Sequence, residues 1–277
     1  MNIISHKNEI EIIDGLDFDL KKIFECGQCF RWNIDENGSY VGVAHGRVAR
    51  MRCVGRSIFI SGSIDDFEEV WRDYLDLDRD YLEIRKSLCI DDFMQQATDF
   101  GAGIRILRQE KWEALCSFII SQNNNIPRIK TIVEALCREF GDSAYFEGKQ
   151  YYTFPSAERL ADVSVESLAP LRCGYRAEYI ISTAKAVASG AVDLDALANA
   201  SSGVARTELK KLHGIGNKVA DCVMLFGLHM LDSFPIDVWI ERAVTEHFGK
   251  DFDPSMFSPY AGIAQQYIFY FKRSEGV

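Results

Sequence analysis

The chain has 277 residues, of which 47% are hydrophobic and 26% charged, and its net charge is −10. These values are typical of a globular protein and exclude collagen-like, disordered and disulfide-scaffold chains. The start of the sequence carries mixed charge without an apolar core, and no uncharged run is apolar enough to span a bilayer, so we expect neither a signal peptide nor a membrane span. The eight scattered cysteines are expected to be reduced thiols of a cytoplasmic protein.

Charge is distributed unevenly along the chain. Residues 61–100 hold twelve acidic and four basic residues, a net charge of −8. Residues 101–130 hold five basic and two acidic residues, and residues 171–220 hold seven and four, so each stretch has a net charge of +3. A local basic face can bind phosphates although the whole molecule is acidic, so the net charge does not exclude a nucleic-acid partner.

The N-terminal part of the sequence predicts strands. Residues 38–62 are rich in β-branched and aromatic residues with glycines at the breaks, and the clearest runs are residues 39–44 and 57–61. An acidic amphipathic helix is predicted over residues 64–76, because its large apolar side chains recur at intervals of three and four.

From about residue 93 the pattern is that of successive helices. Helical spacing predicts six of them, at residues 112–121, 127–140, 175–189, 205–212, 218–230 and 238–248. The fold class is therefore α+β. We expect an N-terminal antiparallel β-sheet domain with helices over residues 1–95, followed by an all-α domain over residues 96–277.

A glycine-rich turn joins two of the predicted helices. Residues 212–221 read LHGIGNKVAD, so one helix ends, Gly214 and Gly216 form a tight turn, and a second helix begins. Glycines let backbone N–H groups approach a phosphate closely, and the dipole of the second helix favours an anion at the same point. The pattern is that of a helix-hairpin-helix, although a turn that only packs two helices together would look the same.

Lys218 and Asp237 are the candidate chemical groups near this turn. They are nineteen residues apart, and a helix followed by a returning loop can bring Asp237 back to the level of Lys218. Asp237 directly precedes an apolar-periodic helix, which is an N-cap position. Taken singly, the first is an ordinary first-turn lysine and the second a helix cap; together, beside a phosphate site, they indicate a functional site far more strongly than either residue alone.

These motifs resemble those of a known family. Gly-Ile-Gly-x-Lys followed by Pro-x-Asp is similar to the helix-hairpin-helix-GPD signature of DNA glycosylases, and within that superfamily the chain resembles the 8-oxoguanine DNA glycosylases. Four further strings carry the closer resemblance, in the family's order: GQCFRW at 27–32, SQNNNI at 121–126, GYRA at 174–177 and PYAGIAQ at 259–265. The resemblance spans about residues 24–272.

The resemblance implies base-excision repair of duplex DNA by a bifunctional glycosylase and lyase. Such enzymes flip the damaged base out of the helix and cut its glycosidic bond. Lys218 matches the family's nucleophile, which attacks C1′ and forms a Schiff base. Asp237 matches the carboxylate that stabilises the cationic sugar. The lysine adds a second activity, β-elimination at the abasic site.

The resemblance also assigns the residues that hold the base. The Gly27 carbonyl is expected to accept the N7–H of 8-oxoguanine, where guanine has a bare acceptor. Gln265 is expected to read the Watson–Crick edge, and Phe269 and Cys222 to lie on the two faces of the base. Without the resemblance, Phe269 and Cys222 would be taken as core residues.

A further group of residues is expected to contact the DNA around the flipped base. Asn123 matches the residue that fills the vacated space in the helix. Arg128, Tyr175 and Arg176 match those that hold the partner base, and two arginines that offer only donors suit the acceptors of cytosine, which is the predicted partner. The alternative for both arginines is general phosphate contact. Trp239 departs from the family, because many members carry histidine there.

The expected partner is damaged double-stranded DNA, bound by a monomer without a membrane, in the cytoplasm with the nucleoid if the source is prokaryotic. No metal or other cofactor is expected to be required, and no iron–sulfur cluster, because the last cysteine, Cys222, precedes the catalytic aspartate. The family's hairpin carbonyls can hold a monovalent cation. Cys26 and Cys29 form a C-x-x-C string, which could also belong to a redox or half zinc site.

Two alternatives to this function stay open. A helix-hairpin-helix module that only binds DNA would need neither Lys218 nor Asp237. A glycosylase for an alkylated purine would share the fold, but alkylation would remove the N7–H or crowd the edge that Gly27 and Gln265 are expected to read.

Overall fold

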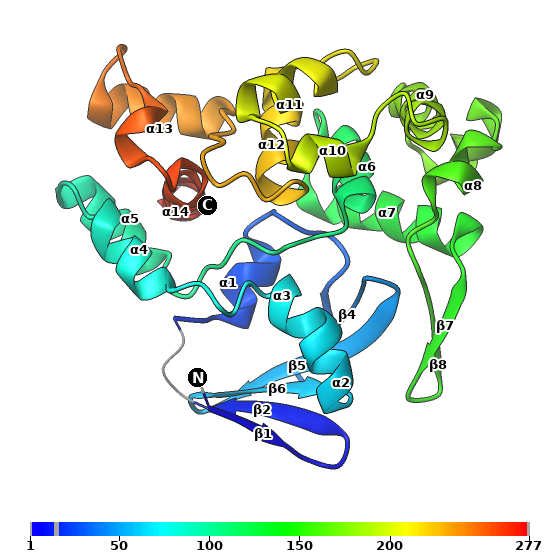
Figure 1. The fold of residues 1–277 in the computed structure, drawn as a ribbon, viewed down its shortest axis with the longest axis horizontal. Helices are drawn as coiled ribbons and strands as arrows, with labels where there is room; N and C mark the ends of the chain where they lie inside the picture. The colour runs from blue at the N-terminus through cyan, green and yellow to red at the C-terminus, as the bar shows by residue number, and fades with distance from the viewer. Residues whose placement is uncertain (1, 14–16, 276–277) are drawn as a thin grey trace.

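The computed structural model describes residues 2–13 and 17–275. Its N-terminal part is a six-stranded antiparallel sheet with the strand order β1-β2-β6-β5-β4-β3, drawn in blue at the bottom of Figure 1. The strands are β1 (Asn2–Ser5), β2 (Glu9–Ile13), β3 (Asn33–Ile34), β4 (Tyr40–Ala44), β5 (Arg47–Val54) and β6 (Ser57–Ser61). The strands predicted at residues 39–44 and 57–61 are thus present, as β4 and β6.

The sheet buries one face against helices. Strand β2 shows the alternation of a half-buried strand, with Ile10 and Ile12 buried. Trp32 packs with Trp71 and Tyr74 beneath the sheet. The helices of this part are α1 (Leu20–Glu25) and a continuous run made of α2 (Ile64–Asp66), the π-helical η1 (Phe67–Trp71) and α3 (Arg72–Tyr74).

The remainder of the described chain is mainly helical and lies above the sheet in Figure 1. Its longer helices are α4 (Tyr81–Leu88), α5 (Asp92–Phe100), α6 (Lys111–Ser121), α7 (Ile126–Phe140), α9 (Arg176–Ala188), α11 (Ser202–Leu209), α12 (Asn217–Phe226), α13 (Val238–Phe248) and α14 (Ala261–Glu275). The shorter ones are α8 (Ala157–Ala161), η2 (Val165–Leu171), α10 (Leu194–Ala198) and η3 (Pro254–Phe257). An antiparallel sheet followed by helices confirms the predicted α+β class, and no described helix is long and apolar enough to cross a membrane.

Two predicted helices have different ends in the structure. The helix predicted at 205–212 is α11, which begins three residues earlier, after Ser201. The helix predicted at 218–230 ends at Phe226, because Gly227 is its C-cap and His229 has a φ of 55°, which the helix cannot continue through. The helical part also contains a hairpin that the sequence analysis did not predict, β7 (Ser143–Phe146) and β8 (Lys149–Tyr152), which extends down beside the sheet in Figure 1.

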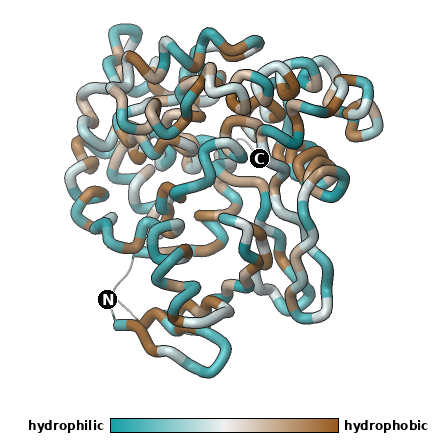
Figure 2. Tube along the Cα trace, turned by 45° about the vertical axis from the view of Figure 1, so that its right-hand side comes forward, coloured by the Kyte–Doolittle hydropathy of each residue, from teal (hydrophilic) through white to brown (hydrophobic). Residues whose placement is uncertain are grey.

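The apolar core forms two clusters, one under the sheet and one among the helices. Helix α4 packs with the helical cluster through Tyr81, Ile84 and Leu88, although residues 81–95 belong by sequence to the first predicted domain. The boundary near residue 95 stays a prediction. Figure 2 shows hydrophobic and hydrophilic segments alternating along both parts, as expected for amphipathic elements around two cores.

Candidate active site

One pocket collects all the residues predicted for catalysis and base binding. It lies where the N-terminal ends of α12 and α13 meet α14, α6 and the turn after α1. Six of its lining residues were predicted from sequence: Gly27, Lys218, Cys222, Asp237, Gln265 and Phe269. Five were not: Cys26, Phe118, Phe226, Pro235 and Gln266. Cys26 and Gln266 directly adjoin predicted residues; Cys26 was noted only as part of the C-x-x-C string, and Gln266 had no other sequence signal.

Lys218 stands in the first turn of α12, where Gly216 is the N-cap. Its side chain is half-buried, and Nζ lies 5.8 Å from the centroid of the Phe118 ring. An aromatic face stabilises a nearby cation, so Phe118 helps to hold the amine in the pocket. Cys222 follows four residues later on the same helix face. Burial raises the pKa of the Cys222 thiol to about 11 despite the neighbouring Lys218, so it is neutral near pH 7.

Asp237 caps helix α13 with one oxygen only. Its Oδ1 atom accepts hydrogen bonds from the backbone N–H groups of Trp239, at 3.0 Å, and Ile240, at 2.9 Å. This cap fixes the carboxylate at the pocket wall, and the second oxygen is not used by the cap. Lys218 and Asp237 therefore line the same pocket, each at the start of a helix.

Gln265 is a buried polar side chain without a full set of partners. It is only 5% exposed, and no described residue donates a hydrogen bond to its Oε1 atom. An unsatisfied buried acceptor costs about 1–3 kcal/mol, which a protein tolerates where a ligand completes the bonding. Phe269 lies one helical turn further along α14 and lines the same pocket.

Gly27 approaches this helix from the other side of the pocket. Its φ of 89° lies in the region that favours glycine. A Cβ there would lie 3.4 Å from Cδ1 of Ile126 and 3.8 Å from the ring of Phe269. The glycine thus lets backbone, rather than a side chain, form this wall of the pocket.

The candidate DNA-contacting residues form a second group at the start of α7 and α9. Tyr175 is 49% exposed, and its hydroxyl accepts a hydrogen bond from Nδ2 of Asn123 at 3.3 Å. Arg128 is exposed and lies beside them, with Nη2 3.4 Å from the carbonyl oxygen of Arg172.

Arg176 differs from its neighbours because it is only 4% exposed. Its guanidinium donates to the carbonyl oxygens of Gln122, Asn123 and Cys173 and lies 4.6 Å from the ring centroid of Tyr175. In this structure, Arg176 holds the loop that carries Asn123 and supports Tyr175.

The two hairpin glycines differ in backbone conformation and in the space around them. Gly214 has a φ of 81°, and a Cβ would lie 2.3 Å from a ring carbon of Tyr179. Gly216 has an extended backbone, and no described atom lies within 4 Å of the position of its Cβ. Gly214 is required by the fold, whereas Gly216 leaves the N-terminus of α12 open to a ligand.

The two cysteines of the C-x-x-C string are packed in different parts of the core. Cys26 packs in the helical cluster and Cys29 in the cluster under the sheet, both as free thiols, and burial raises the pKa of Cys26 to about 12. Among residues 2–13 and 17–275 there is no group of three or more histidine, cysteine, aspartate or glutamate side chains arranged to hold a metal. Trp239, at the position that departs from the family, is 43% exposed beside Asp237.

Two family models match consecutive parts of the chain. Residues 12–115 match "8-oxoguanine DNA glycosylase, N-terminal domain", and residues 116–256 match "HhH-GPD superfamily base excision DNA repair protein". The N-glycosylase/DNA lyase of Saccharomyces cerevisiae is 41% identical over 152 residues, which are 50% of this chain and 40% of the yeast protein. The chain thus matches less than half the length of that relative.

The solved structures that match essentially the whole chain include two that contain DNA. MBOgg1, solved in complex with a low-affinity DNA ligand, is 43% identical with a TM-score of 0.94 and covers 100% of both chains. The 8-oxoguanine glycosylase/lyase of Clostridium acetobutylicum, solved with double-stranded DNA containing cytosine opposite 8-oxoguanine, is 36% identical with a TM-score of 0.94 and covers 100% of this chain and 99% of its own.

Proposed function

Since the chain belongs to the 8-oxoguanine DNA glycosylase branch of the HhH-GPD superfamily of base-excision repair proteins, we propose that it removes 8-oxoguanine from duplex DNA and then nicks the strand at the abasic site. The observation that carries this proposal is the pocket shared by Lys218, Asp237 and the orphaned amide oxygen of Gln265. The first two provide chemistry on the sugar, and the third provides recognition of a polar base.

The proposed reaction begins at the sugar of the flipped nucleotide. The neutral amine of Lys218 attacks C1′, the glycosidic bond breaks, and the base leaves with the bonding electrons and takes up a proton. Positive charge develops on the sugar as the bond breaks, and the carboxylate of Asp237 stabilises it. Ring opening then gives a Schiff base, from which loss of a C2′ proton eliminates the 3′ phosphate. Water releases Lys218 again, so no metal or redox cofactor is needed.

Base selection in this proposal depends on one proton. The Gly27 carbonyl accepts N7–H from 8-oxoguanine but meets a lone pair in guanine, a difference of about 1–3 kcal/mol. Gln265 presents both an acceptor and a donor to the Watson–Crick edge. Phe269 and Cys222 are neutral and fit the two faces of a flat base.

We also propose that cytosine is the preferred partner base. Arg128 is exposed and offers only donors, which match O2 and N3 of cytosine, whereas adenine presents an amino donor on its edge. Arg176 would join this contact by exchanging one of its bonds to the loop at Gln122 and Asn123. Similar excision rates opposite cytosine and adenine would contradict this part.

The test is borohydride trapping on a duplex with one 8-oxoguanine opposite cytosine, comparing the parent with Lys218→Gln. We expect a covalent complex and strand nicking with the parent alone. A trapped complex with Lys218→Gln would contradict Lys218 as the nucleophile. If the folded parent neither traps nor releases the base, the chain is a DNA-binding module or acts on another lesion, and a duplex containing an alkylated purine distinguishes these two alternatives.

A further inference from the structure

Gln266 is a buried amide of the pocket to which the proposed reaction gives no role. It follows Gln265 on α14, is 2% exposed, and its Nε2 atom donates a hydrogen bond of 3.0 Å to the carbonyl oxygen of Cys26. Adjacent residues on a helix point about 100° apart, so the two amides serve different neighbours. The Oε1 atom of Gln265 accepts no hydrogen bond from a described residue, while the Gln266 amide donates one to the backbone next to Gly27.

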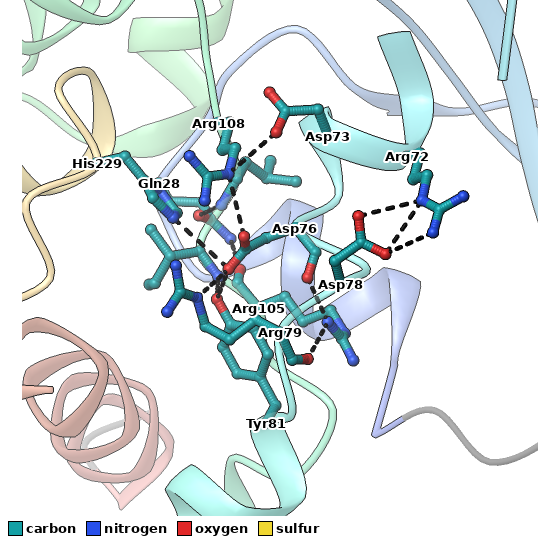
Figure 3. A network of polar contacts seen from close by, with 12 residues as sticks. Gln28, Arg72, Asp73, Asp76, Asp78, Arg79, Tyr81, Arg105, Arg108 and His229 are labelled. Atoms are coloured by element: carbon teal, nitrogen blue, oxygen red, sulfur yellow. Dashed lines mark hydrogen bonds and ion pairs between the residues drawn. The ribbon is translucent and has the colours of Figure 1, made fainter. Parts of the chain in front are cut away.

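The other side of Gly27 is fixed as well. Gln28 is fully buried, its Oε1 atom accepts from the N–H of Leu107 at 2.9 Å, and its Nε2 atom donates to the carbonyl oxygens of Ile23, at 2.9 Å, and Arg105, at 2.8 Å. Figure 3 shows Gln28 inside the polar network around Asp76 and Arg105. The backbone after Gly27 is therefore anchored to the segment that leads into α6.

Gly27 itself supplies little stiffness. At a φ of 89° it has no Cβ to restrict rotation, so the direction of its carbonyl depends on the peptides on each side. The Gln28 contacts anchor the following peptide. The Gln266 contact anchors the preceding peptide, because the Cys26 carbonyl belongs to the same planar unit as the Gly27 N–H.

We propose that Gln266 is a positioning residue that sets the specificity for 8-oxoguanine over guanine, by fixing the Cys26–Gly27 peptide so that the Gly27 carbonyl points at N7. A hydrogen bond weakens steeply when its angle is poor, so discrimination by one proton needs a fixed carbonyl. Because Gln265 and Gln266 share α14, this helix sets the distance between the two elements that read the base. The inference rests on the proposed function.

The experiment compares base release with cleavage of an abasic site. Gln266→Met keeps the length of the side chain and its helix propensity but removes the donor. We expect the ratio of kcat/KM for 8-oxoguanine over guanine to fall about tenfold, which corresponds to one ordinary hydrogen bond. Nicking of a duplex with a preformed abasic site should stay within about twofold of the parent, because no base is read there.

Gln150→Met is the chemical control, because it makes the same substitution in the exposed β7–β8 hairpin. Among the described contacts, the Gln150 amide donates a hydrogen bond only to Ser143. This variant should change neither the rate of base release nor the rate of abasic nicking. An unchanged ratio in Gln266→Met, or an equal fall in base release and abasic nicking, would overturn the inference while the proposed function stands. A parent that releases no 8-oxoguanine would overturn both. If Gln266→Met melts below the assay temperature, Gln266→Ala, which also lacks the donor and favours helix, takes its place with the same expected ratio.

Discussion

At the residue scale, the hairpin shows how two glycines in one motif serve different purposes. Gly214 combines a positive φ with a close approach to the ring of Tyr179, and Gly216 has neither. Gly216 is instead the N-cap of α12, and the unpaired backbone N–H groups of a helix N-terminus favour an anion, as the proposed DNA contact requires. The sequence motif alone gives both glycines equal weight, whereas the structure shows a folding role for Gly214 and leaves only the proposed DNA-binding role to Gly216.

Alanine should therefore act mainly on stability at Gly214 and mainly on DNA affinity at Gly216. Gly214→Ala should lower the free energy of unfolding by at least about 2 kcal/mol, because the left-handed backbone alone costs ~1–2 kcal/mol and the methyl group would also displace Tyr179. Gly216→Ala should cost about 1 kcal/mol or less as a weaker N-cap, yet reduce affinity for DNA, because its methyl group crowds an approaching phosphate.

Thermal unfolding and fluorescence anisotropy with a duplex carrying an abasic-site analogue measure the two effects separately. Greater destabilisation by Gly216→Ala than by Gly214→Ala, or unchanged DNA affinity in Gly216→Ala, would contradict this division of roles.

At the element scale, Asp237 is the N-cap of α13 and also the carboxylate to which the proposed reaction gives a chemical role. Asp237→Asn retains an oxygen that can accept from Trp239 and Ile240 but loses the negative charge. We expect base excision to fall about 100-fold or more, as for loss of one electrostatic stabiliser, while the free energy of unfolding changes by less than about 0.5 kcal/mol. Asp237→Ala should be equally inactive, and its free energy of unfolding should be about 1 kcal/mol lower than that of Asp237→Asn, because the cap is gone.

Asp193 provides the matched control. It caps α10 with the same hydrogen-bond pattern, its Oδ1 atom accepting from the N–H groups of Asp195 and Ala196 at 2.9 Å each. Asp193→Ala should lower the free energy of unfolding by about 1 kcal/mol and keep full activity. Chemical denaturation and single-turnover base release check all three variants. A large loss of stability in Asp237→Asn would mean that its inactivity has a structural cause.

Elements with a strong periodic pattern were predictable from sequence, and weakly patterned ones were not. The long helices α6, α7 and α13 were predicted to within a residue at each end. The β7–β8 hairpin was missed because its strands have four residues each and little buried surface, so no apolar alternation marks them. Helix α11 was predicted to begin too late because Ser202 and Gly203, which lie in its first turn, are weak helix formers.

The pocket was predictable where a motif assigned a residue, and not where tertiary contacts decide. Motifs in four separate segments contributed Gly27, Lys218, Asp237 and Gln265, which the structure places around one pocket. Nothing in the sequence shows that Gln266, rather than its neighbour Gln265, donates a hydrogen bond to the Cys26 carbonyl. That role depends on how α14 packs against a turn 240 residues away in the chain.

At the scale of the whole molecule, Asp76 joins segments that lie far apart in the sequence. Its side chain is 4% exposed in the turn between α3 and α4, and Figure 3 shows it at the centre of a polar network. It accepts from Arg79 at 2.7 Å, Arg108 at 3.1 Å and the hydroxyl of Tyr81 at 2.9 Å. Nε2 of His229, in the loop between α12 and Asp237, lies 3.5 Å away. The turn after α3, which belongs to the sheet part, and the loop between α12 and α13 are thus connected through the carboxylate of Asp76.

The charge of Asp76 makes this connection dependent on pH. Burial favours the neutral form, but the contacts with His229 and Arg79 outweigh it and hold the pKa of Asp76 well below its usual value. A lowered pKa in the folded state means that the stabilisation is present above the unfolded pKa of ~3.9 and is lost as pH falls below it. Stability of the parent should therefore decrease in strongly acidic solution.

Asp76→Asn isolates this contribution, because asparagine tolerates the φ of 48° at this position and keeps an oxygen for Tyr81. We expect the free energy of unfolding to fall by about 3 kcal/mol at pH 7, as when one partner of a buried ion pair is removed. The difference in this free energy between variant and parent should narrow as pH falls below about 4. Asp78→Asn is the control, because Asp78 is 68% exposed and its ion pair with Arg72 should contribute about 1 kcal/mol or less. Urea unfolding at pH 7 and pH 3 measures both; a gap that stays constant between these pH values would show that the charge of Asp76 is not what connects the two parts.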